Sequence, residues 1–114
     1  MKNERRPPRR ITANSLGNVA QHYLARFAAS EDGLRQVLRR RIRKSAEVHD
    51  IDIDEAHGWV EDLIIRYRGA GLLDDHTFAA GRARSLHRRG TSRRAIGAKL
   101  AVKGITSKLA RTVL

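Results

Sequence analysis

Cysteine is absent from this sequence, and no apolar run reaches the roughly 18 residues that a membrane-spanning helix needs. The chain can therefore form neither disulfides nor thiolate metal sites, which suits a reducing compartment. The first ten residues are charged and lack the apolar stretch of a signal peptide. From these absences we expect a cytoplasmic protein with no membrane partner.

Proline and aromatic residues are scarce as well. The two prolines are adjacent, at Pro7 and Pro8, so the sequence from Ile11 onward is free of the strongest helix breaker. Aromatic residues make up only 4% of the 114 residues, but 40% are hydrophobic. That proportion is sufficient for helices packed in thin layers.

Acidic residues are few and unevenly placed. The sequence contains 24 Lys and Arg against 12 Asp and Glu, a formal net charge of +12, and residues 76–114 contain no acidic residue at all. A surface of this kind attracts phosphate backbones or acidic protein faces. We therefore expect a polyanionic partner rather than a charge that merely keeps the protein in solution.

Apolar residues recur at three- and four-residue spacing through most of the chain, which predicts an all-α fold. Residues 1–11 lack this spacing and include four arginines and both prolines, so we expect a flexible basic arm there. A first three-helix unit is expected over 12–70, and a second, complete or incomplete, over 71–114. The expected helices run over 13–28, from Ser30 to about 44, over 54–67, from Asp74 to 88, from Thr91 or Ser92 to Gly104, and from Thr106 or Ser107 onward.

Side-chain orientations follow from the same spacing. Phe27 and Trp59 fall on apolar stripes and are expected to be buried, whereas Arg35 and Arg39 are expected to face outward. Other residues have the chemistry of helix caps, helix stops or core positions, and Asp74 and Asp75 in particular are assigned to capping and positioning rather than to partner contact. The residues with such structural roles are Ser30, Asp74, Asp75, Phe78, Gly90 and Gly104.

The sequence also contains a weak internal repeat. A shift of 62 residues places Ser30 on Ser92, Leu34 on Ile96 and Leu38 on Leu100, so that one cap and two apolar positions keep their register. Two amphipathic helix pairs can agree in this way by chance. The alternative is a tandem array of three-helix units, in which each unit gives its neighbour a face to bury.

No pattern supports a metal site or an enzyme. Asp50, Asp52, Asp54 and Glu61 match four positions of a calcium-binding loop, but Glu55 stands where that loop requires glycine. Capping and the helix dipole explain these acidic residues better. None of the five histidines has the spacing of a zinc protease, and no nucleophile elbow or phosphate-binding glycine loop is present. We expect no catalytic residue, no cofactor and no metal.

The segment from Gly71 to Ile105 has an ordered set of motifs. Paired aspartates precede a helix that begins with phenylalanine, ends in arginines and stops at glycine, and the next helix ends in lysine-glycine. This order resembles the signature of the RecX family of recombinase regulators, and Tyr23-Leu24 also fits, so the resemblance covers roughly 11–114. The matching residues are Gly71, Leu73, Asp74, Asp75, Phe78, Arg84, Arg89, Gly90, Ile96, Leu100, Lys103 and Gly104.

The sequence departs from the family pattern at several positions. Thr77 and Ala95 stand where family members often have a basic residue, and Ser92-Arg93 replaces a frequent glycine-proline. The family usually continues into a third three-helix unit, whereas this sequence ends at Leu114. Two readings follow from this departure, a complete regulator of two units or a shortened one, and the sequence does not choose between them.

The resemblance implies a curved array of helices that binds the filament formed by the RecA recombinase on single-stranded DNA. Family members restrain strand exchange and ATP hydrolysis, so the expected partners are the filament and single-stranded DNA, directly or through the filament, with no small-molecule substrate. The alternative is a helix-turn-helix-like DNA-binding protein, although the later helices lack base-reading Asn or Gln. The candidate contact residues are Arg35, Arg39, Arg40, Arg43, Arg82, Arg84, Arg88, Arg89, Arg93, Arg94, Lys99 and Lys103.

Overall fold

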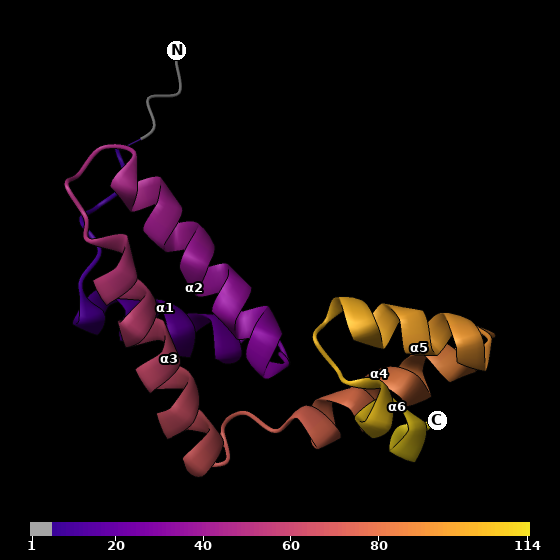
Figure 1. Ribbon diagram of the computed structural model, residues 1–114. Helices are drawn as coiled ribbons and strands as arrows, with labels where there is room; N and C mark the ends of the chain where they lie inside the picture. Colours follow the sequence, from indigo (N-terminus) through magenta and orange to yellow (C-terminus); the bar gives the residue numbers. More distant parts are fainter. Residues whose placement is uncertain (1–5) are drawn as a thin grey trace.

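The computed structural model describes residues 6–114, and within this range the chain forms six α-helices and no strand (Figure 1). The expected all-α fold is therefore confirmed. The helices begin and end close to the residues that the sequence predicts. They are α1 (Ala13–Leu24), α2 (Glu31–Ala46), α3 (Ile53–Gly69), α4 (Asp75–Arg88), α5 (Arg93–Val102) and α6 (Ser107–Val113).

The helices form two three-helix units, each with its own core. Helices α1, α2 and α3 pack around one buried cluster, and α4, α5 and α6 pack around another. Figure 1 shows the two units as separate groups joined by the connection between α3 and α4. The largest fully buried side chains of the two cores are Leu16, Leu34, Leu38, Ile42, Val60 and Ile64 in the first unit, and Ile96 and Leu100 in the second.

The internal repeat of the sequence corresponds to a repeat of structure. Ser30 and Ser92 are the N-caps of α2 and α5, and their hydroxyls accept hydrogen bonds from the backbone N–H three residues later, at 3.0 and 3.1 Å. Leu34 and Ile96 are buried one turn further along these helices. The structure therefore supports tandem units rather than chance agreement.

Three helices end in the same glycine motif. In α4, Gly90 N donates to His87 O at 2.9 Å and Thr91 N donates to Leu86 O at 3.0 Å, the two bonds of a Schellman motif. Gly71 and Gly104 close α3 and α5 in the same way, and all three glycines have φ between 78° and 86°. Because side chains rarely adopt this conformation, these positions favour glycine.

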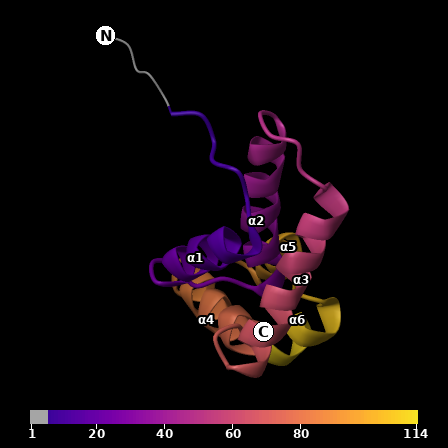
Figure 2. The same ribbon diagram turned by 90° about the vertical axis from the view of Figure 1, so that its left-hand side faces the viewer.

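The segment before α1 is partly held in place. Ile11 is buried, and its N–H donates to Ser45 Oγ at 3.0 Å, while that hydroxyl donates to Arg9 O at 2.9 Å. The imidazole Nε2 of His49 lies 2.9 Å from Pro8 O. Figure 2 shows this segment running beside α2 to the start of α1. Residues 8–11 are thus bonded to the first unit, and residues 1–5 of the expected flexible arm lie outside the described part of the chain.

Two expected core residues are not fully buried. Helix α1 ends at Leu24, before Phe27, because the chain turns there and the N–H groups of Arg26 and Phe27 both donate to Tyr23 O. Phe27 is consequently 54% exposed. Trp59 packs against the edge of the first core and is only partly buried. The expected burial of these two side chains is wrong, because each lies at the edge of a helical layer.

The two units meet at the N-terminus of α2. Ser30 Oγ donates to Lys103 O at 2.7 Å, and Asp75 Oδ1 accepts from Glu31 N at 2.8 Å. Gly104 lies so close to Asp32 that a Cβ at position 104 would overlap the Asp32 Cβ. Both hydrogen bonds satisfy groups at a helix end, so the joint uses the polar groups that every helix end leaves free.

We predict that Gly104→Ala destabilises the protein. Its positive φ alone should cost about 1–2 kcal/mol, and the overlap with Asp32 adds to this loss. A urea titration measures the change. Gly58→Ala is the control, because nothing lies within 4 Å of a Cβ in that helical position, and it should leave stability unchanged or raise it by about 0.5–1 kcal/mol. Equal stabilities for the two variants would contradict the role assigned to Gly104.

Candidate interaction surface

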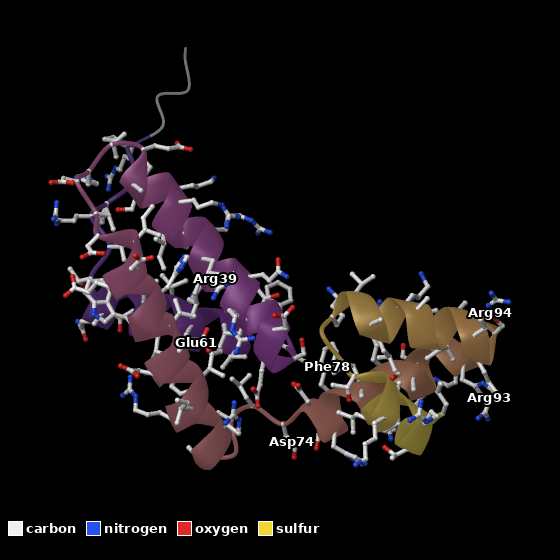
Figure 3. The ribbon with its side chains drawn as sticks, viewed as in Figure 1. Arg39, Glu61, Asp74, Phe78, Arg93 and Arg94 are labelled. Atoms are coloured by element: carbon white, nitrogen blue, oxygen red, sulfur yellow. The ribbon has the colours of Figure 1, made fainter. Side chains whose placement is uncertain are left out.

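From residue 76 onward, the second unit has basic side chains and no acidic one. Arg93 and Arg94 lie in the first turn of α5, at the end remote from the first unit, and both side chains point away from the ribbon (Figure 3). Within residues 6–114, no ion pair involves a side chain beyond Asp75. The exposed candidate residues of this unit are Arg84, Arg88, Arg89, Arg93, Arg94, Lys99 and Lys103.

The turn between α4 and α5 brings four of these cations to one end of the unit, whereas Lys103 lies at the other end of α5, at the joint with the first unit. Arg88 and Arg89 end α4, and Ser92 caps α5, so both pairs of arginines flank a turn of a few residues. Arg84 and Arg93 line the same pocket of about 230 Å³, which shows that cations of the two helices share a surface. Positive charge in the first turn of α5 opposes the helix dipole and therefore contributes nothing to helix stability.

Arg82 lies elsewhere. Its side chain is half-buried and lines a groove of about 700 Å³ between the two units, together with Leu24, Tyr67 and Phe78. Phe78, labelled in Figure 3, is partly buried against the second core. The structure thus separates Arg82 from the arginines at the far end of α4.

Two of the four candidate arginines on α2 are engaged within the protein. Arg35 donates from Nε to Glu61 Oε2 at 2.7 Å and from Nη2 to Glu61 Oε1 at 3.1 Å, and it also pairs with Asp32. Arg39 lies 3.6 Å from the same glutamate (Figure 3). The Arg35 side chain is only 22% exposed, so the expectation that it faces outward is wrong. Arg40 and Arg43 are exposed as expected.

The titration properties of these groups follow from the contacts. The hydrogen bonds from Arg35 lower the pKa of Glu61, and the same contact raises the pKa of Arg35. The hydrogen bonds from Arg68, at 2.7 and 2.8 Å, likewise lower the pKa of Glu31. Arg35 therefore joins α2 to α3 as one half of a charged pair, and its charge is largely compensated.

Both paired aspartates accept hydrogen bonds from backbone N–H groups of the protein. Asp74 is the N-cap of α4 and accepts from Thr77 N at 3.1 Å, which lowers its pKa (Figure 3). Asp75 accepts from Glu31 N across the joint between the units, and burial raises its pKa. Both carboxyl groups act at helix N-termini, one in its own helix and one in the neighbouring unit.

The acidic residues that match a calcium loop do not converge. Asp52 caps α3 by accepting from Glu55 N at 3.0 Å, and Glu61 faces Arg35. Within residues 6–114, no three His, Cys, Asp or Glu side chains are placed together to hold a metal ion. In the same part of the chain, no helix combines the length and hydropathy needed to cross a bilayer.

Sequence reasoning missed a second basic region, in the first unit. Arg9, Arg41 and Lys44 line one surface depression beside α1 and α2, although Arg9 is distant from the other two in sequence. Arg41 and Lys44 are three residues apart on α2, which was a usable signal because such residues share a helix face. The contribution of Arg9 depends on the anchoring of the segment before α1, which the sequence pattern does not reveal.

Comparisons with known proteins agree with the motifs of the second unit. The family model described as "RecX, second three-helix domain" matches residues 74–114. The chain is 40% identical over 110 residues to the protein named "Regulatory protein RecX" from Myxococcus xanthus (strain DK1622), an alignment that covers 95% of this chain and 59% of that relative. The chain thus spans about three fifths of the length of that relative. No solved structure matches the chain.

We predict that the Arg35–Glu61 pair makes stability depend on pH. Because the folded-state pKa of Glu61 lies below its usual value of 4.5, the ionised carboxylate contributes stability above that pH. This contribution is lost as the pH falls through the lowered pKa. Glu61→Gln should lower the free energy of unfolding by at most about 1 kcal/mol at neutral pH, since the carboxylate is partly exposed. The variant should also lose less stability than the unaltered protein as the pH falls into the acid range.

Urea titrations from pH 7 to pH 3 test this prediction. Glu47→Gln is the matched control, because Glu47 is exposed and takes part in none of the ion pairs found among residues 6–114. An identical pH profile for the two variants would show that the Arg35–Glu61 contact contributes nothing to folding.

Proposed function

This chain belongs to the RecX family, and from that premise we propose that it regulates a RecA-type recombinase. It does so by binding the filament that the recombinase forms on single-stranded DNA, and by restraining strand exchange and ATP hydrolysis there. The chain acts by binding rather than by catalysis. The observation that carries the proposal is the uncompensated basic surface at the end of α4 and the start of α5.

The charge of this surface suits a nucleoprotein filament. A filament presents DNA phosphates together with protein, and cations that are free of intramolecular partners keep their full attraction for such charges. Arg88, Arg89, Arg93 and Arg94 meet this requirement, because none of them forms an ion pair within residues 6–114 and no acidic residue follows Asp75 in the sequence. Arg35 and Arg39 meet it poorly, because Glu61 already engages them.

The shape of the described chain also suits a filament. Its radius of gyration is 16.5 Å, against about 13 Å for a compact domain of the same length, and its extents are 44 × 40 × 22 Å. The two separate cores account for this extension, since each unit buries its own apolar residues. A small protein with this thin, two-unit shape presents a long face to an extended partner.

A helix-turn-helix-like DNA-binding protein is the second candidate function. It is favoured by one observation, the exposed arginines in the first turn of α5, which follow the tight turn after α4. The rest of α5 consists of Ala, Ile, Gly, Lys, Leu and Val, so it lacks the Asn or Gln that would read bases. A filament regulator acts on recombinase-coated DNA at concentrations well below those at which it binds naked duplex DNA, whereas a simple DNA-binding protein does not.

We predict that replacing Arg88, Arg89, Arg93 and Arg94 together with alanine abolishes inhibition of the recombinase filament. The melting temperature should stay nearly unchanged, because these side chains are exposed and form no ion pair in the described structure. Filament ATPase inhibition and co-sedimentation with filaments are the measurements.

Two double variants that remove equal charge from different places show whether inhibition depends on the position of the arginines or on net charge. Arg93→Ala/Arg94→Ala should weaken inhibition strongly. Arg66→Ala/Lys108→Ala removes the same charge from exposed positions on α3 and α6 and should leave inhibition nearly intact. Equal losses in the two double variants would mean that net charge alone governs binding, and full activity of the quadruple variant would reject this surface.

A further inference from the structure

A basic trough runs along the first unit, between the segment before α1, helix α1 and helix α2. It consists of two adjoining depressions of about 640 and 450 Å³, which share Asn18, Val19 and Arg41. Among the described residues that line it, the ionisable side chains are Arg, Lys, His and Tyr, and none is acidic. We call this feature the α1–α2 trough and define it by Arg9, Tyr23, Arg26, Phe27, Arg41 and Lys44.

The cations of the trough are free for a ligand. Arg9, Arg26, Arg41 and Lys44 are exposed, and in the part of the chain from residue 6 onward the ion pairs involve other residues. This distinguishes them from Arg35, on the same helix, whose charge is compensated by Glu61. Uncompensated cations that line one depression attract a ligand with several negative charges in sequence.

The backbone that carries Arg9 is already in place. Its carbonyl accepts from Ser45 Oγ, and that hydroxyl also accepts from Ile11 N, so the segment is attached to the C-terminal part of α2. Arg41 and Lys44 lie on the same stretch of α2, one turn apart. A preorganised arrangement of this kind binds an anionic chain with a smaller loss of conformational entropy.

An aromatic pair, the exposed Phe27 and the half-buried Tyr23, lies at the other end of the trough. The ring centroids of Tyr23 and Phe27 are 5.0 Å apart, with the rings tilted by 39°. The hydrogen bond from Phe27 N to Tyr23 O, at 2.9 Å, holds the two residues one turn apart. Phe27 remains 54% exposed among basic side chains and is not among the residues of the hydrophobic core. An exposed aromatic face next to free cations is the combination that binds unpaired bases.

We propose that the α1–α2 trough is a binding site for single-stranded nucleic acid. Phosphates contact Arg9, Arg41 and Lys44, and an unpaired base stacks on Phe27, next to Arg26. A duplex hides the faces of its bases, and an acidic peptide has no base to stack, so the aromatic pair favours a single strand over both. This inference goes beyond the proposed function, because it assigns direct nucleic-acid contact, without any recombinase, to the unit opposite the basic end of α5.

The phosphate contacts are tested by fluorescence anisotropy with a labelled oligothymidylate and the full chain, in the absence of recombinase. Arg41→Ala/Lys44→Ala should weaken binding, and the slope of log affinity against log salt should become shallower by about 1.4, or 0.7 for each lost phosphate contact. Arg66→Ala/Lys108→Ala removes the same charge elsewhere and should keep the original slope. Equal slopes in the two variants would overturn the assignment.

The stacking contact is tested independently. Phe27→Ala should lower affinity for the oligothymidylate on the order of tenfold, and Phe27→Trp should keep affinity and show fluorescence quenching when the strand binds. A second measurement needs no variant, because an abasic strand of equal length should bind the unaltered protein on the order of tenfold more weakly. Equal affinity for the abasic strand and the oligothymidylate would overturn the stacking model.

Competitors decide the class of ligand. Unlabelled oligothymidylate should displace the probe at much lower concentration than a duplex or poly-glutamate with the same number of charges. Displacement by poly-glutamate at the same concentration would overturn the proposal in favour of an acidic peptide. Since no recombinase is present in these experiments, their failure leaves the filament assays unaffected, and a failure of those assays leaves the trough untouched.

Discussion

The N-terminus of α2 is the point at which the two three-helix units are held together. A helix start leaves N–H groups without intrahelical partners, and here they are satisfied from both sides of the joint. Ser30 caps Gly33 N and donates its own proton to Lys103 O, while Asp75 accepts from Glu31 N. Both acceptors belong to the second unit, because Asp75 begins α4 and Lys103 follows the end of α5, whereas both donors lie at the start of α2. The orientation of the basic second unit relative to the first therefore depends on the same bonds that start α2.

Among residues 6–114, the acidic residues form ion pairs with arginines in the first unit but not in the second. In the first unit, Glu61 and Glu31 compensate Arg35 and Arg68 and strengthen the packing of α2 against α3. The second unit has no acidic residue after Asp75 and is stabilised by its apolar core and its capped helix ends. Its arginines are therefore available to a partner. The charges of Arg35 and Arg68 thus contribute to folding, whereas the arginines at the end of α4 and the start of α5 form no ion pair in the described structure.

Local signals in the sequence were the reliable ones. The caps at Ser30 and Asp74 and the stop at Gly104 lie where the sequence predicts them, because a cap or a positive-φ glycine acts on backbone groups only a few residues away. The 62-residue repeat was also readable, since apolar spacing and caps recur together. The burial of side chains at the edges of the helical layers was not readable from the sequence. Phe27 and Trp59 continue apolar stripes, and periodicity does not show where the neighbouring helix stops covering a stripe.

The sequence by itself determined the helices, their order in two units and the excess of positive charge, because propensity, caps and composition are properties of neighbouring residues. Only the tertiary structure decided which charges remain free. Arg35 and Arg40 look alike in the sequence, but Arg35 meets Glu61, 26 residues away, and Arg40 meets solvent. Arg9 joins Arg41 because its segment is bonded to Ser45, 36 residues away. Electrostatic contacts act over a few ångströms of space, and the spatial neighbours of a side chain are set by the packing of whole helices.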